Sequence, residues 1–238
     1  MEKVLWVTGG GSGMGAAAAR YAAASGWRVA LSGRRADALD EVAERISADG
    51  GEVLTLPLDV TDPEQVRAGH DAVVERFGRL DGLVLSAGLN TPRRDWADQS
   101  MEEFARVVDV NLTAVARVLD VALPQLRRTA GVVVVISSIA AWRTNPQAGV
   151  AYSASKAALA PLVASLNFEE AEHGVRACHL CPGYVATDFM KLRADVPDAA
   201  AQAEMLTADD VGRAVGFVLD APPHVRIDEL VISPVSQR

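Results

Sequence analysis

Short apolar segments alternate with longer helical patterns along this chain. Seven segments rich in Val, Leu and Ile are mostly apolar throughout: 3–7, 28–32, 52–56, 82–86, 132–137, 175–181 and 229–233. Strands that are covered on both faces have this composition. Helical patterns lie between them: 13–25, 36–49, 63–77, 101–128, 151–173 and 208–220. The alternation predicts an α/β fold in a single domain over residues 1–238, with a doubly wound sheet of about seven parallel strands and helices on both faces.

Three features depart from this regular alternation: the irregular segments 89–99 and 188–206, and Pro161. Each segment follows the carboxyl end of a predicted strand, where ligands bind in sheets of this kind. We therefore expect 188–206 to be a substrate loop, with an alanine-rich mobile surface segment as the alternative. Pro161 cannot donate a hydrogen bond to the carbonyl of Ala157, so it predicts a kink in the helix over 151–173.

The composition excludes several classes of partner. The 238 residues carry a formal net charge of −8, and no run of Lys and Arg exceeds two residues. Nucleic acid and anionic membrane surfaces attract basic proteins, so neither is an expected partner. No apolar run reaches the ~20 residues of a membrane span, and no signal-type segment is present. These features predict a soluble, cytoplasmic protein.

Cys178 and Cys181 are the only cysteines, and both lie in a predicted strand. Side chains three apart on a strand point to opposite faces, so this pair is not expected to form a disulfide or to share a metal ion. We predict two free thiols, no metal site, and an ordinary strand position for His179.

A glycine-rich turn, Thr8 to Gly15, follows the first strand and opens the first helix. Glycines allow a tight turn and the close approach of a pyrophosphate, and the helix amino terminus offers free N–H groups. In this context the motif indicates a dinucleotide site of the Rossmann type, with a packing turn without ligand as the alternative. The turn residues expected to bind the cofactor are Gly9, Gly11, Ser12, Gly13, Met14 and Gly15.

The second strand ends in Ser32-Gly33-Arg34-Arg35 and carries no carboxylate that would bind the ribose diol of NAD. Guanidinium groups suit a 2′-phosphate and can stack on adenine. The segment therefore predicts NADP(H) as the cofactor, with Arg34 as the main contact and Ser32 and Arg35 beside it. A solvated basic pair is the alternative interpretation.

Tyr152 and Lys156 lie four residues apart in a predicted helix, so their side chains share one face. A free phenol has a pKa of about 10 and exchanges protons poorly near neutrality. A fixed positive charge beside it favours the phenolate and lowers that pKa. The pair therefore predicts a proton-transfer site.

Together these features resemble the short-chain dehydrogenase/reductase family over essentially the whole chain. The resemblance implies catalytic roles for Asn111, Ser138, Tyr152 and Lys156. It implies cofactor contacts from Tyr152 and Lys156 and from residues after the third, fourth and sixth strands: Asp59, Val60, Ser86, Ala87, Gly88, Pro182, Gly183, Val185 and Thr187.

The family resemblance also implies a reaction, in which a hydride passes between NADP(H) and the carbonyl carbon of a small molecule, interconverting a carbonyl and a secondary alcohol. Tyr152 would exchange the proton, Lys156 would lower the pKa of the tyrosine and hold the nicotinamide ribose, and Ser138 would orient the substrate oxygen. Asn111 would help to hold a water that links Lys156 to solvent.

Two positions depart from the family pattern. Ser86 stands where the family usually has asparagine, and the interval from Ser138 to Tyr152 is one residue longer than is common. The longer interval falls in the expected pocket wall, so we expect it to affect specificity. It also leaves Ser137 as an alternative to Ser138 for the catalytic serine.

The substrate pocket is expected between residues 89–94, 139–150 and 184–193. Its candidate contacts are Trp142, Arg143, Asn145, Tyr184, Phe189 and Met190. An inward Arg143 would favour a carboxylate substrate. The alternatives are that Trp142 and Phe189 close the core and that Arg143 is a solvated loop residue. The carboxyl-terminal segment resembles NADP-dependent 3-hydroxy acid and serine dehydrogenases, so a small hydroxy acid is the expected substrate.

Two other functions stay open from the sequence. One is reduction of a 3-oxoacyl thioester on an acidic carrier protein, which Arg127 and Arg128 could contact, and the other is a non-catalytic dinucleotide sensor. The family resemblance also implies a homodimer or homotetramer built through the helices that carry Asn111 and Tyr152.

Overall fold

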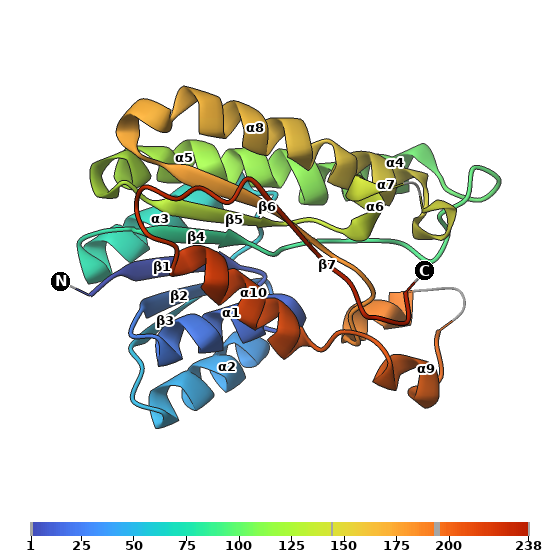
Figure 1. Cartoon of the computed structure of the whole chain (residues 1–238), viewed down its shortest axis with the longest axis horizontal. Helices are drawn as coiled ribbons and strands as arrows, with labels where there is room; N and C mark the ends of the chain where they lie inside the picture. Colours follow the sequence, from blue (N-terminus) through green and yellow to red (C-terminus); the bar gives the residue numbers. More distant parts are fainter. Residues whose placement is uncertain (1, 144, 193–195, 238) are drawn as a thin grey trace.

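Seven strands form one parallel sheet in the order β3-β2-β1-β4-β5-β6-β7 (Figure 1). This computed structural model describes residues 2–143, 145–192 and 196–237. The strands are β1 (Val4–Thr8), β2 (Arg28–Gly33), β3 (Val53–Pro57), β4 (Gly82–Leu85), β5 (Val132–Ile136), β6 (Arg176–Pro182) and β7 (Glu229–Ile232). The predicted doubly wound sheet is confirmed, and each strand agrees with its predicted segment to within one residue at either end.

Helices cover both faces of the sheet (Figure 1). One face carries α1 (Gly13–Ala24), α2 (Ala36–Ala48) and α10 (Ala208–Leu219), and the other carries α3 (Pro63–Phe77), α5 (Ala114–Thr129) and α8 (Leu159–Glu169). The shorter helices are α4 (Met101–Val108), α6 (Ile139–Trp142), α7 (Val150–Ala157) and α9 (Ala199–Ala203). Among the described residues, no helix is both long and apolar enough to cross a membrane.

The hydrophobic core consists of two layers, one on each side of the sheet. Strands β1, β4 and β5 are buried along their whole length, which explains why their sequences carry no polar side chain except that of Thr8. Alternate residues of one strand enter opposite layers, as Leu5 and Trp6 do. The helices complete each layer with their apolar faces.

Two predicted helices are each divided in the structure. The pattern over 101–128 forms α4 and α5 with a π-helical turn, Asp109–Thr113, between them. The pattern over 151–173 forms α7, α8 and a 3₁₀ turn, Ala171–His173. The break between α7 and α8 lies one turn before Pro161, which lacks the N–H that would bond to the Ala157 carbonyl. The predicted interruption by Pro161 therefore takes the form of two consecutive helices.

Two of the segments expected to line the site contain short helices that the sequence pattern did not indicate. Segment 139–150 includes α6 and a 3₁₀ turn, Pro146–Ala148. Segment 188–206 includes a 3₁₀ helix, Asp188–Leu192, and α9. Residues 193–195 of the expected substrate loop lie outside the described residues. Segment 89–99 has no helix or strand, as expected.

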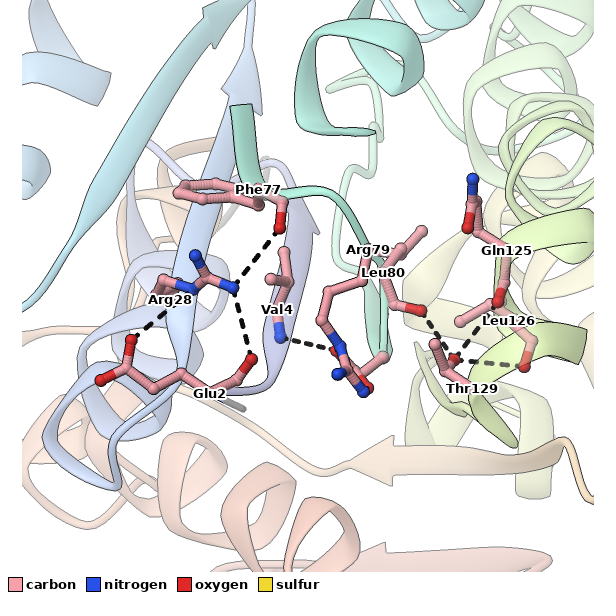
Figure 2. A network of polar contacts seen from close by, with 10 residues as sticks. Glu2, Val4, Arg28, Phe77, Arg79, Leu80, Gln125, Leu126 and Thr129 are labelled. Carbon is pink, nitrogen blue, oxygen red and sulfur yellow. Dashed lines mark hydrogen bonds and ion pairs between the residues drawn. The ribbon is translucent and has the colours of Figure 1, made fainter. Parts of the chain in front are cut away.

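Polar contacts tie together the amino-terminal edge of the sheet (Figure 2). The buried carboxylate of Asp81 accepts hydrogen bonds from the Val4 N–H at 2.9 Å and from Arg79 Nε at 2.8 Å. Thr129 donates to the Leu80 carbonyl at 2.7 Å, which fixes the end of α5. These bonds satisfy backbone groups where β1 and β4 begin. The opposite, carboxyl-terminal edge carries the loops that form the candidate site.

Candidate active site

Two adjoining hollows open at the carboxyl ends of the strands. The longer one, here called the dinucleotide cleft, lies beside the glycine-rich turn and the ends of β2 and β3. The other, here called the catalytic pocket, is bounded by the ends of β5 and β6 and by α7. The residues that line both are Met14, Ser86, Gly88, Thr187 and Phe189. The two hollows are therefore continuous, and they lie where the strand order reverses between β1 and β4.

The glycine turn packs directly against the segment that follows β4. Gly9 has a φ of +67°, and a Cβ atom there would lie 2.8 Å from the Ala87 nitrogen. A Cβ atom on Gly15 would lie 2.3 Å from the Gly9 oxygen. Both positions therefore need glycine to bring the start of α1 this close to the sheet. Gly9, Gly11, Ser12, Gly13 and Met14 line the dinucleotide cleft, whereas Gly15 packs beneath the turn.

The far end of the cleft contains the two arginines that follow β2. Arg34 and Arg35 line it together with Asp59 and Val60. Ser32, in contrast, is fully buried, and its hydroxyl accepts a hydrogen bond from Trp6 Nε1 at 3.0 Å. Among the predicted cofactor residues, the structure thus places Ser32 in the core and brings both arginines to the cleft.

Tyr152 and Lys156 lie on one face of α7 and both line the catalytic pocket. The Lys156 Nζ atom is 5.9 Å from the centroid of the Tyr152 ring and donates to the Ile136 carbonyl at 2.9 Å. Burial of this ammonium lowers the pKa of Lys156 from 10.5 to about 8. The Phe189 ring lies 5.9 Å from the tyrosine ring between centroids. The predicted pair is therefore assembled inside a pocket.

Asn111 connects the loop after β4 to α7. Its side chain accepts from the Leu89 N–H at 2.7 Å and donates to the Leu89 carbonyl at 2.9 Å and to Ser155 Oγ at 3.1 Å. Asn111 is fully buried within the π-helical turn. Turns of this kind are frequent at functional sites, because they redirect a side chain from a continuous helix. Here the asparagine fixes the backbone beside Gly88, close to Lys156.

The two serines after β5 differ in their contacts. Ser138 is half-buried and caps the amino terminus of α6, where its hydroxyl accepts a hydrogen bond from the Ala140 N–H at 3.2 Å. Ser137 is buried and donates to the Lys156 carbonyl at 3.2 Å. Both line the pocket. Ser137 is thus engaged in holding α7, while the Ser138 hydroxyl can still donate its hydrogen to a ligand. This difference favours Ser138.

The pocket wall includes most of the predicted substrate contacts. Asn145, Tyr184, Phe189 and Met190 line it, as do the expected nicotinamide-binding residues Pro182, Gly183, Val185 and Thr187. Trp142 and Arg143 line a neighbouring outer groove, and Trp142 is exposed. Residue 193, at the end of the third expected wall segment, lies outside the described residues.

Two lining residues, Asn90 and Arg94, were not among the individual candidates from the sequence. Both are buried and lie in the irregular segment 89–99. Arg94 Nε donates to the Thr91 carbonyl at 3.0 Å, and Asn90 donates to the Ala148 carbonyl at 3.0 Å. The neighbouring Arg93 instead pairs with Glu103 at the surface. The sequence located this wall but could not indicate which of two adjacent arginines turns inward.

The catalytic pocket has a positive electrostatic character. Among the described residues that line it, Arg94 and Lys156 are the charged ones, and no Asp or Glu is present. This contrasts with the net charge of −8 for the whole chain. A pocket of this kind favours a ligand that carries a negative charge.

Comparison with known proteins identifies the class. The profile of the short chain dehydrogenase family matches residues 3–197, and the chain belongs to this family of oxidoreductases. The predicted membership is thus confirmed. An alcohol dehydrogenase from the archaeon Thermococcus sibiricus, solved in complex with 5-hydroxy-NADP, is 34% identical with a TM-score of 0.90, and the match covers 100% of this chain and 99% of that structure.

Two curated relatives are similar along nearly the whole chain. Glycine betaine reductase ATRR of Emericella nidulans is 38% identical over 98% of this chain, which spans only 19% of that longer relative. Sulfoacetaldehyde reductase 2 of Chromohalobacter salexigens is 33% identical, and the match covers 100% of this chain and 96% of the relative. Both relatives carry the name of a reductase.

Proposed function

We propose that this protein reduces the carbonyl group of a small anionic molecule with NADPH, or oxidises the corresponding alcohol with NADP. The observation that carries the proposal is the continuity of the dinucleotide cleft with a pocket that contains Tyr152, Lys156 and Ser138. The glycine turn fits the cofactor because the close packing of Gly9 and Gly15 holds the turn against the sheet, so that Gly11, Ser12 and Gly13 line the cleft at the amino terminus of α1.

The side chains of the pocket account for the proton chemistry. When bound, NADPH supplies the hydride for the carbonyl carbon. Ser138 donates a hydrogen bond to the substrate oxygen, and Tyr152 delivers a proton to that oxygen as negative charge develops on it. The Lys156 ammonium stabilises the resulting phenolate from one helical turn away. Asn111 acts through the backbone, because it fixes the loop beside Lys156.

The two arginines at the end of β2 support NADP(H) over NAD(H). A guanidinium in this part of the cleft suits a 2′-phosphate. We expect Arg34→Ala to lower kcat/KM for NADPH by about 10- to 100-fold, the effect of losing one or two charged hydrogen bonds, and to change kcat/KM for NADH little. Arg45→Ala removes an exposed charge from α2 and serves as the control. A wild-type preference for NADH would contradict the proposal.

The positive pocket supports an acid as the substrate class. Arg94 and Lys156 are the charged residues among the described residues that line it. The relative named sulfoacetaldehyde reductase acts on a sulfonate by its name, and a 3-hydroxy acid would present a carboxylate in the same way. We infer that a carboxylate or sulfonate lies toward Arg94, with the carbonyl toward Tyr152.

Arg94→Gln tests this assignment of the acid group. We expect KM for an anionic aldehyde to rise by about 10- to 100-fold, while KM for a neutral aldehyde of similar size stays within about threefold. Arg93→Gln is the matched control, because the adjacent Arg93 lies at the surface in a pair with Glu103. An equal rise in KM for the anionic and the neutral aldehyde would show that Arg94 supports the loop and does not recognise the charge of the substrate.

Reduction of a 3-oxoacyl thioester on a carrier protein is less well supported. Arg127 forms an ion pair with Glu170, and it lies with Arg128 in the last turn of α5, at the sheet edge opposite the pocket. A panel of substrates separates this function from the reduction of a small anionic molecule: sulfoacetaldehyde, 3-oxo acids, L-serine, neutral ketones and an acyl-carrier thioester. We expect turnover of sulfoacetaldehyde, 3-oxo acids and L-serine. The oligomeric state and the compartment stay predictions.

A further inference from the structure

Three potential metal ligands meet on one face of the sheet, beside the candidate active site. None of them lines the catalytic pocket, but the Cys181 thiol lies against Ser137 and close to Lys156. His179 and Cys181 lie two residues apart on β6, so their side chains share a face, and Glu229 lies directly opposite His179 in the parallel register of β7. Cys178 points to the other face, into the core layer with α1 and α10. The ligand cluster is thus built from two adjacent strands.

The distances within this cluster approach those of a metal site. The His179 Nδ1 atom is 3.0 Å from Glu229 Oε1 and 3.4 Å from Cys181 Sγ, and all three ligand atoms lie within 4.8 Å of one another. Ligand atoms of a tetrahedral zinc ion are about 3.3–3.8 Å apart, given metal–ligand distances of about 2.0–2.3 Å. Small side-chain movements would therefore suffice to admit an ion.

The cluster does not have the arrangement of a nucleophilic triad. In a triad the carboxylate and the nucleophile bind different nitrogens of the histidine ring. Here Glu229 binds Nδ1, and the Cys181 sulfur also lies nearer to Nδ1 than to Nε2, at 3.4 and 3.7 Å. Because Glu229 and Cys181 both lie nearest to the same histidine nitrogen, the three side chains cannot relay a proton through the ring. Metal coordination, in contrast, requires that three ligand atoms point toward one position, as they do here.

The adjacent groove gives a cation a route to the cluster. His179 and Glu229 line this groove together with part of α8. Among the described residues of its wall, the charged side chains are Glu169, Glu172, Asp228 and Glu229 against a single arginine, Arg226. The groove therefore attracts cations. Glu229 is partly exposed, while His179 and Cys181 are buried, so an ion would enter past the carboxylate.

We propose that His179, Cys181 and Glu229 bind a divalent cation of the zinc type, with solvent from the groove as the fourth ligand. The mixture of sulfur, nitrogen and oxygen donors suits Zn²⁺ or Co²⁺ and not Mg²⁺ or Ca²⁺, which prefer oxygen. Coordination displaces the thiol proton of Cys181 to solvent. The sequence prediction of no metal site considered Cys178 with Cys181 and could not include Glu229, which comes from another strand.

Cobalt spectroscopy of the whole chain tests this site without reference to activity. The chain is freed of metal with a chelator and titrated with Co²⁺. We expect a thiolate-to-cobalt charge-transfer band that saturates at one ion per chain and that Zn²⁺ abolishes. Cys178→Ser should retain the band, because it removes the thiol on the opposite face, and Cys181→Ser should lose it.

Glu229→Gln provides a second variant at a partly exposed position, so it tests the site even if Cys181→Ser does not fold. Its Co²⁺ affinity should fall by at least about tenfold, since even the outer partners of metal ligands contribute that much. No charge-transfer band in the wild type, a band that persists in Cys181→Ser, or unchanged affinity in Glu229→Gln would overturn the proposal.

Discussion

Replacing Tyr152 with phenylalanine is expected to lower kcat by about 10²- to 10⁴-fold, the range associated with loss of a general acid, while the affinity for NADPH stays unchanged. The substitution removes the hydroxyl that exchanges a proton and keeps the ring that packs 5.9 Å from Phe189. Steady-state kinetics and fluorescence titration with NADPH measure the two quantities on the same preparation.

Tyr21→Phe is the matched control for this experiment. Tyr21 lies on α1, where its ring packs against Gly216 of α10, far in the fold from the end of α7. Its hydroxyl has no part in the proposed chemistry, so kcat should not change. Equal turnover by Tyr152→Phe and wild type would remove Tyr152 from the mechanism.

Replacing Lys156 with methionine is expected to remove most turnover and also to stabilise the folded chain at neutral pH. The turnover loss should again be about 10²- to 10⁴-fold, because the phenolate loses its neighbouring cation. The stabilisation follows from burial of the ammonium, which lowers the pKa of Lys156 from 10.5 to about 8. At about 1.4 kcal/mol per pKa unit, the buried charge costs up to about 3 kcal/mol at pH 7.

The lowered pKa of Lys156 also determines how the stability difference between Lys156→Met and the wild type changes with pH. Between about pH 8 and 10.5 the unfolded chain retains the Lys156 proton and the folded chain does not. The unfolded state then binds more protons, so this group makes the free energy of unfolding rise with pH across that window. Below about pH 8 the cost of the buried charge is present in full. The advantage of Lys156→Met should therefore shrink as the pH rises from 8 toward 10.5.

Urea unfolding at pH 7, 8, 9 and 10 measures the difference in the free energy of unfolding between Lys156→Met and the wild type. The contributions of the other titrating groups are common to both proteins and cancel in this difference. Lys3→Met is the control, because Lys3 is exposed in the folded chain. Its effect on the free energy of unfolding should not vary over the same range. A pH-independent difference for Lys156→Met, or destabilisation at pH 7, would contradict the interpretation of Lys156 as a buried cation.

Much of the fold could be predicted because strands buried on both faces leave a strong sequence signal. Val132–Ile136 is apolar over its full length, Val4–Thr8 is apolar up to Thr8, and Arg176–Pro182 is mostly apolar apart from Arg176 and His179; each forms a strand. The glycine turn was also visible in the sequence, since close packing against Ala87 leaves no room for a side chain at Gly9, and packing against Gly9 leaves none at Gly15. In both cases the signal itself is confined to a short stretch of sequence.

The features that escaped prediction depend on contacts between distant segments. The π-helical turn at Asn111 exists because that side chain bonds to Leu89 and to Ser155, which lie on separate elements. Arg94 lines the pocket as well as the outer groove, while Arg143 lines the groove alone. Neither the π-helical turn nor the position of these arginines is indicated by a periodic pattern of apolar residues in the sequence. The same is true of Glu229, which reaches His179 only through strand pairing.

Transfer of deuterium from NADPH labelled at C4 is the most direct test of the central claim, that this pocket delivers hydride and proton to one carbonyl group. The wild-type chain is incubated with an anionic aldehyde from the substrate panel and with each of the two stereospecifically labelled forms of NADPH, and the product is analysed by mass spectrometry. We predict one deuterium on the carbinol carbon from one labelled form and none from the other. Product without deuterium from either form, or oxidation of NADPH without an alcohol product, would contradict the account.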